Sequence, residues 1–200
     1  MRLFAFLLAG FIGLTAIPVQ AQESTPPKSP QETPRPQQAR RPITLDSLFD
    51  RLAKAQDEDE AKGIAAQIEK RWERSGSDTA DLLLSRANEA VEAKDYPLAV
   101  ELLDRVITLQ PNWAEAWNQR ATVFYLLDDP VSAMADLRQT LKLEPRQFNA
   151  WAGLGHIYMA SDDKARALNA YRRALAINPQ FPILKKIVDH LAPEIDGLDL

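Results

Sequence analysis

Apolar side chains recur along residues 80–181 at the three- and four-residue spacing that marks one face of an α-helix. In the stretch Trp117–Asp129, for example, Trp117, Ala121 and Phe124 share such a face. Short polar turns interrupt the pattern at Lys94–Pro97, Asp128–Pro130 and Ser161–Lys164. The pattern predicts an all-α protein made of helix pairs.

The helix pairs repeat with a period of 34 residues. The positions that align in this register are Pro111, Pro145 and Pro179; Ala99, Ala133 and Ala167; Leu103, Leu137 and Tyr171; Leu83, Trp117 and Trp151; and Ala87, Ala121 and Gly155. Small residues let two antiparallel helices approach closely, and the larger residues fill the gap between repeats. Because each pair leaves an apolar face that only its neighbour covers, the pattern predicts a stacked α-solenoid.

The third copy of the repeat resembles the tetratricopeptide repeat. Its residues are Trp151-Ala152-Gly153-Leu154-Gly155-His156-Ile157-Tyr158, followed by Ala167, Tyr171 and Pro179, and they match the landmarks of that family. The resemblance covers residues 80–181 and implies three helix-turn-helix repeats, at 80–113, 114–147 and 148–181. We expect residues 43–77 to form a degenerate helical hairpin that serves as the N-terminal cap, and residues 182–200 to form a capping helix, ending at Leu191, and a tail.

The first 42 residues differ in composition from the rest. Arg2 precedes an apolar run from Leu3 to Ile17, and small residues near Ala21 suit cleavage by a signal peptidase. Residues 1–21 are therefore interpreted as a signal peptide, which predicts export, to the periplasm in a two-membrane bacterium. The alternative is an uncleaved segment that tethers the chain to a membrane. Residues 22–42 hold six of the 14 prolines and are predicted to be a disordered linker.

Composition restricts the chemistry that the chain can perform. It has no cysteine and two histidines, His156 and His190, which excludes thiol catalysis and leaves few candidates for metal or acid–base sites. The paired aspartates at 128–129 and 162–163 suit turns and helix capping. We predict no enzymatic activity, no cofactor and no metal site. Residues 43–200 carry 19 basic and 26 acidic side chains, a net charge of −7, which argues against a nucleic-acid partner.

The candidate functional surface is the concave groove that the first helix of each repeat lines in arrays of this type. The candidate partner-binding residues are Asn88, Asn118, Gln119, Thr122, Tyr125, Asn149 and His156. Their amide and hydroxyl groups can bind an extended peptide, and Leu84, Tyr125 and Met159 are expected to add apolar contacts. Some co-chaperones with this repeat grip a C-terminal carboxylate through Lys/Arg and Asn. Only Asn88 matches here, so a neutral or basic peptide suits the groove better.

Two functions follow as hypotheses. The chain resembles bacterial exported tetratricopeptide-repeat proteins, which implies a protein-binding scaffold or chaperone-like adaptor of the cell envelope, with a protein or peptide partner in the groove. Once the signal segment is cleaved, no stable membrane insertion is expected. The alternative is a structural or self-associating subunit, for example of a homo-oligomer. Surface residues such as Trp113 and Leu198 would then make the contacts, and the groove would capture no peptide.

Arg120 stands on the apolar face of Trp117–Asp129, where a charge is unexpected. Arg86 occupies the same repeat position 34 residues earlier, so the arginine is a feature of the repeat. An arginine can lay its aliphatic stem along a helix pair and extend its guanidinium to a carboxylate. We predict an ion pair between Arg120 and Asp136 on the second helix of the same repeat.

Overall fold

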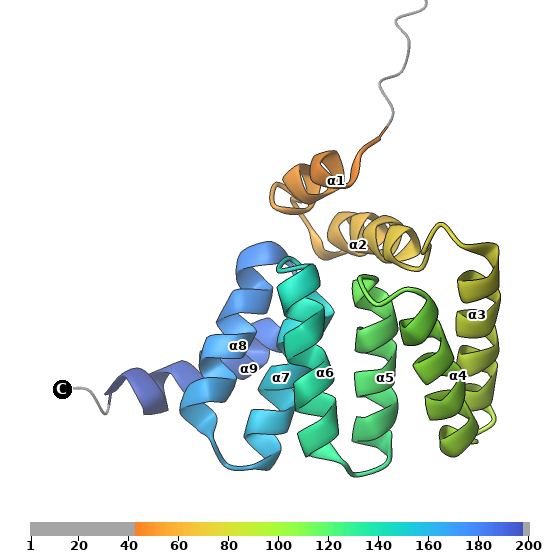
Figure 1. The fold of residues 1–200 in the computed structure, drawn as a ribbon. Coiled ribbons are helices and arrows are strands. Elements are labelled where there is room, and N and C mark those ends of the chain that lie inside the picture. The colour runs from red at the N-terminus through yellow and green to blue at the C-terminus, as the bar shows by residue number, and fades with distance from the viewer. Residues whose placement is uncertain (1–42, 198–200) are drawn as a thin grey trace, which may run out of the picture. The chain divides into compact units, whose positions relative to one another are not determined.

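The computed structural model describes residues 43–197, which form nine α-helices and no strand (Figure 1). The helices are α1 (Leu45–Leu52), α2 (Glu58–Trp72), α3 (Asp78–Glu92), α4 (Tyr96–Leu109), α5 (Ala114–Leu126), α6 (Pro130–Leu143), α7 (Phe148–Ala160), α8 (Lys164–Ile177) and α9 (Pro182–Asp196). The all-α prediction is confirmed. Within the described range, no helix is both long and apolar enough to span a bilayer. The predicted signal peptide and linker lie outside the described residues.

The turns inside the repeats share one backbone design. Their first residue is Lys94, Asp128 or Asp162, with φ of 60°, 59° and 58° in the left-handed region. The next residue is an aspartate whose carboxylate accepts a hydrogen bond from the backbone N–H three residues later; these caps are Asp95 on Leu98 (3.2 Å), Asp129 on Ser132 (3.0 Å) and Asp163 on Arg166 (3.0 Å). The predicted turn and capping roles of the paired aspartates are confirmed.

The close approach of the two helices in a repeat depends on small residues. Gly155 on α7 faces the ring of Tyr171 on α8, and a Cβ atom at Gly155 would collide with that ring. Tyr171 is buried, and one repeat earlier the corresponding residues Ala121 and Leu137 are buried in one core cluster. The 34-residue pattern of small residues therefore marks where neighbouring helices touch.

The hairpin of α1 and α2 differs in position from the expected cap of the first repeat. Trp72 of α2 packs on Phe148, the first residue of α7, with ring centroids 5.5 Å apart. The Trp113 indole N–H, next to the start of α5, donates a 2.6 Å hydrogen bond to the Trp72 carbonyl oxygen. The hairpin thus lies against the N-terminal ends of α5 and α7 (Figure 1), because its large apolar residues are buried there.

The two ends of the array are covered differently. Leu82, Leu98 and Leu109 of α3 and α4 remain exposed. Trp113 is partly buried, and its indole N–H is hydrogen-bonded within the chain; Leu198 lies outside the described residues. At the other end, α9 was expected to stop at Leu191 but continues to Asp196. An ion pair of Asp196 with Arg172 of α8 (2.5 Å) holds the added turn.

Candidate functional site

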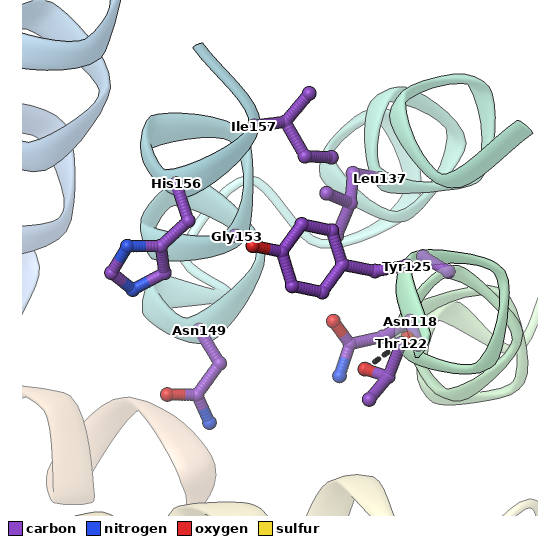
Figure 2. Close-up of a pocket in the computed structure, with 9 residues that line it drawn as sticks. Asn118, Thr122, Tyr125, Leu137, Asn149, Gly153, His156 and Ile157 are labelled. Atoms are coloured by element: carbon purple, nitrogen blue, oxygen red, sulfur yellow. Dashed lines mark hydrogen bonds between the residues drawn. The ribbon is translucent and has the colours of Figure 1, made fainter. Parts of the chain in front are cut away.

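A pocket of about 310 Å³ opens between α5 and α7 (Figure 2). Its lining is amide, hydroxyl and imidazole on one part and aliphatic on the other; the residues are Asn118, Ala121, Thr122, Tyr125, Leu137, Asn149, Gly153, His156 and Ile157. The structure therefore brings together five of the seven candidate residues, from the first helices of the second and third repeats. The absence of a side chain at Gly153 keeps the floor open, since a Cβ there would lie 3.2 Å from Leu137 Cδ1.

Two candidate residues lie elsewhere. Asn88 is on α3, in the first repeat, and does not line the pocket. Gln119 is on α5, but its side-chain amide donates a 2.6 Å hydrogen bond to Glu115. Leu84, expected to offer an apolar contact in the groove, is instead buried in the core between α3 and α4. The predicted binding surface spans three repeats, whereas this pocket lies between the first helices of two.

The pocket has a buried carboxylate behind it that sequence reasoning missed. Glu115, in the first turn of α5, is only 6% exposed. Its oxygen atoms accept hydrogen bonds from the side-chain amides of Gln119 (2.6 Å) and Gln147 (2.6 Å), and from Asn118 at 3.4 and 3.5 Å. Burial raises the pKa of Glu115 to about 7, although these hydrogen bonds act in the opposite direction. Glutamate is rarely buried and is common in the first turn of an exposed helix, so sequence patterns do not indicate this burial.

The α1–α2 hairpin contributes a second carboxylate to the same region. Glu69 of α2 accepts a 2.8 Å hydrogen bond from the side-chain amide of Asn149, a residue of the pocket. Nearby, Arg146 pairs with Asp46 of the hairpin at 2.7 Å and stacks its guanidinium over Phe49, 4.2 Å from the ring centroid. The hairpin is therefore held beside the pocket by polar contacts as well as by its buried rings.

Comparison with known families assigns the helix pairs. Residues 84–138 and residues 148–181 each match a model of the tetratricopeptide repeat. This chain contains tetratricopeptide repeats. It is 40% identical over 97 residues to a TPR repeat-containing protein of Rhizobium etli, and the match covers 48% of this chain and 48% of that protein. The chain thus spans about half the length of this curated relative.

Solved tetratricopeptide domains share the fold. The first such domain of Spaghetti (RPAP3), solved with an HSP90 peptide, has a TM-score of 0.56 at 18% identity and covers 60% of this chain and 95% of its own. The Sgt2 domain of Aspergillus fumigatus has a TM-score of 0.56 at 21% identity, and the match covers 62% of this chain and 83% of the Sgt2 chain. The predicted fold, an all-α solenoid of tetratricopeptide repeats, is confirmed.

His156 lies on the pocket wall, in the third tetratricopeptide repeat. Its Nδ1 is 2.9 Å from the hydroxyl of Tyr171, in edge-to-face contact with that ring. Burial lowers the pKa of His156, which favours the uncharged imidazole, and burial raises the pKa of Tyr171 to about 12. A neutral imidazole offers the pocket a hydrogen-bonding edge without a charge. Among the described residues, no cluster of His, Asp and Glu is arranged to hold a metal ion.

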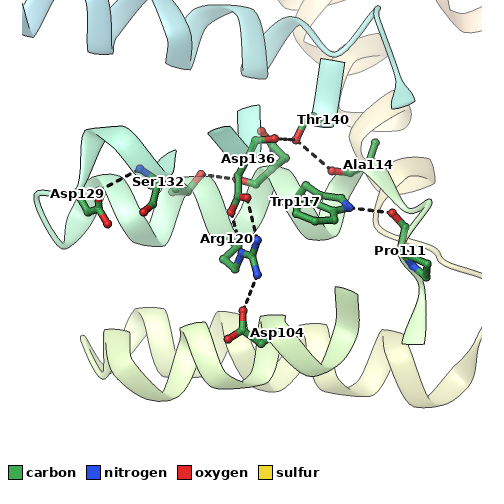
Figure 3. Close-up of polar contacts among 11 residues, drawn as sticks. Asp104, Pro111, Ala114, Trp117, Arg120, Asp129, Ser132, Asp136 and Thr140 are labelled. Carbon is green, nitrogen blue, oxygen red and sulfur yellow. Dashed lines mark hydrogen bonds and ion pairs between the residues drawn. The ribbon is translucent and has the colours of Figure 1, made fainter. Parts of the chain in front are cut away.

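Arg120 connects two tetratricopeptide repeats and does not line the pocket. Its Nε and Nη2 donate to the two oxygen atoms of Asp136 at 2.7 and 2.8 Å, and its Nη1 donates to Asp104 of α4 at 2.6 Å (Figure 3). Asp136 is only 4% exposed. The guanidinium also lies over the Trp117 ring, 4.9 Å from its centroid. The predicted Arg120–Asp136 pair is confirmed. With its second partner Asp104, Arg120 joins α4, α5 and α6.

Proposed function

We propose that this protein is a non-enzymatic scaffold or chaperone-like adaptor of the bacterial cell envelope, which binds a peptide segment of a partner protein between α5 and α7. The observation that carries the proposal is the pocket itself. It lies on the first helices of two tetratricopeptide repeats and combines polar side chains with an aliphatic floor. Tyr125, at the edge of the pocket, is 48% exposed, and burying such a large aromatic side chain against a partner would favour binding.

The chemistry of the lining suits a peptide. An extended backbone needs both donors and acceptors; the amide oxygen atoms of Asn118 and Asn149 can accept, and the hydroxyl of Tyr125 can donate. The aliphatic floor at Leu137 and Ile157 receives a side chain. A tetratricopeptide domain of the same fold has been solved with a bound peptide, which supports a protein partner of this kind.

A site-specific photo-crosslink in cells tests the binding site. A photoreactive amino acid at Thr122, inside the pocket, should yield a defined crosslinked partner, whereas the same group at the exposed Arg138 on α6 should not. The partner crosslinked from Thr122 should disappear with Asn118→Arg, which fills the pocket. It should persist with Asn88→Arg, which adds the same charge outside it. Identical crosslinks from both positions would contradict a binding site between α5 and α7.

The envelope location rests on the interpretation of residues 1–21 and is tested separately. In cell fractionation we expect the tagged protein in the periplasm, with a mature N-terminus just after Ala21. An intact N-terminus in the membrane fraction would favour the tethered alternative. A cytosolic protein with an intact N-terminus would refute the location.

The exposed Leu82, Leu98 and Leu109 favour a second function, that of a self-associating subunit. In that case the outer surface of the first repeat would pair with another copy of the chain. Sedimentation of the purified mature protein distinguishes the two, because a homo-oligomer should dissociate on Leu82→Glu. A monomer at every accessible concentration would remove this candidate.

A further inference from the structure

The two asparagines of the pocket are oriented by carboxylates. Asn149 directs its Nδ2 to Glu69 at 2.8 Å, and Asn118 directs its Nδ2 to Glu115 at 3.4 and 3.5 Å. In both contacts the carboxyl oxygen atoms accept the hydrogen bond, so each asparagine turns its NH2 group toward a carboxyl group. In Figure 2 the amide nitrogen atoms of Asn118 and Asn149 both point toward the lower edge of the picture.

The amide oxygen atoms are left as acceptors. Within residues 43–197, neither Asn118 Oδ1 nor Asn149 Oδ1 takes part in a hydrogen bond, because the contacts of both side chains are made through Nδ2. Thr122 gives its hydroxyl hydrogen to the Asn118 backbone carbonyl oxygen at 3.1 Å, which leaves the lone pairs of its Oγ1 available. The oxygen atoms of Asn118, Asn149 and Thr122 are therefore available to a ligand as acceptors.

The electrostatic surroundings have the same preference. No lysine or arginine lines the pocket, whereas the carboxyl groups of Glu69 and Glu115 stand directly behind the two asparagines. Glu73 lies close enough to Glu115 to raise its pKa further. Arg146, two residues before the start of α7, is paired with Asp46 and Glu144. The Glu69 carboxylate behind Asn149, together with the acceptor oxygen atoms in front of it, favours a cation in the pocket.

We propose that the pocket binds a basic side chain, lysine or arginine, of the partner peptide. Its N–H groups donate to the amide oxygen atoms of Asn118 and Asn149, and its charge lies against the ring of Tyr125. The aliphatic stem lies along the apolar floor. A carboxylate in the same place would face acceptor oxygen atoms with two carboxyl groups behind them. This inference rests on the function proposed above and names the chemistry of the partner.

Peptide pools that differ at one position test this preference on the full chain. Each pool has nine residues of mixed Ala, Gly and Ser around a fixed central residue, which is Arg, Lys, norleucine, Gln or Glu. Fluorescence anisotropy should give an affinity for the Arg and Lys pools about tenfold above the norleucine pool, with the Glu pool weakest. Norleucine is the decisive comparison, because it keeps the stem of lysine and lacks the charge.

Variants then locate the preference. Asn149→Leu should bring the Lys and norleucine pools to within about twofold of each other, because it removes an acceptor while keeping a side chain of similar size. Glu69 is a positioning residue that acts through Asn149. In Glu69→Gln the amide can donate as well as accept, so Asn149 can reverse and the preference for Lys should fall. Glu58→Gln, the same change at an exposed position of α2, should leave the preference intact.

The outcomes separate this inference from the function on which it rests. A preference for Arg and Lys that Asn149→Leu removes, in a chain with an unchanged far-UV spectrum, supports both. Equal binding of all pools that is lost in Asn118→Arg overturns the basic side chain and leaves peptide binding in place. Binding of no pool, or binding indifferent to Asn118→Arg, overturns the peptide-binding pocket and the inference with it.

Discussion

Replacing the buried Glu115 by glutamine should change how the stability of the protein depends on pH. The pKa of Glu115 is raised from 4.5 to about 7 in the folded chain, chiefly by burial. The folded chain therefore holds a proton that the unfolded chain releases between these two values. The stability contributed by this protonation is fully present below pH 4.5 and is lost as the pH rises through about 7.

The size of the effect follows from the shift. A difference of about 2.5 pKa units corresponds to about 3 kcal/mol, at about 1.4 kcal/mol per unit. Glutamine has no charge to bury, and its amide can donate to Gln147 Oε1, which is buried without a hydrogen-bond partner. The free energy of unfolding of Glu115→Gln relative to the natural chain should therefore rise by about 3 kcal/mol between pH 4.5 and pH 8.

Urea unfolding followed by far-UV circular dichroism at pH 4.5, 6, 7 and 8 measures this difference. Other titrating groups contribute equally to both proteins, so only the difference between them is interpreted. Glu89→Gln on the exposed side of α3 is the matched control and should show a difference that does not vary with pH. A difference for Glu115→Gln that stays constant to within about 0.5 kcal/mol across this range would refute the reasoning.

Three further substitutions test the packing by chemical denaturation. Gly155→Ala should cost about 1–3 kcal/mol through collision with a buried tyrosine ring, while Gly63→Ala, with open space around it, should not destabilise the fold. Arg120→Met should cost about 3–5 kcal/mol because it leaves the buried Asp136 carboxylate unpaired, and Asp136→Asn in the same chain should recover part of that loss. Trp72→Ala should cost about 3–5 kcal/mol and accelerate hydrogen exchange in α1 and α2 before α5–α8; simultaneous acceleration would contradict a separately docked hairpin.

The repeats could be predicted from the sequence because each repeat position has the same structural role in every copy. Pro111, Pro145 and Pro179 follow the residues at which α4, α6 and α8 leave helical geometry. The recurrence of arginine at Arg86 and Arg120 indicated a packing role, and Asp136 on the second helix of the repeat was the predicted acceptor. Within the pocket, the residues of α5 and α7 were predicted by the same helical periodicity.

The remaining features depend on contacts between distant parts of the chain. Residues 43–77 are outside the 34-residue register, so no pattern indicates that Trp72 packs on Phe148. The burial of Glu115 results from Gln147, which belongs to the next repeat. Asn88 and Gln119 have the same polar character and helical position as the residues that do line the pocket. What separates them is the tertiary environment, which periodicity does not encode.

The contacts of the hairpin also indicate an order of folding. Asn149 bonds Glu69 across 80 positions of the chain, Arg146 bonds Asp46 across 100, and Gln180 bonds the Ala55 carbonyl oxygen across 125. Each repeat, in contrast, closes mainly on segments nearby in sequence, which is the fast step in helical arrays. The segment that leaves the ribosome first among the described helices therefore docks last. Until residues 148–181 have folded, the apolar side of α1 and α2 has no surface to cover it, and any chaperone that handles the nascent protein would bind there.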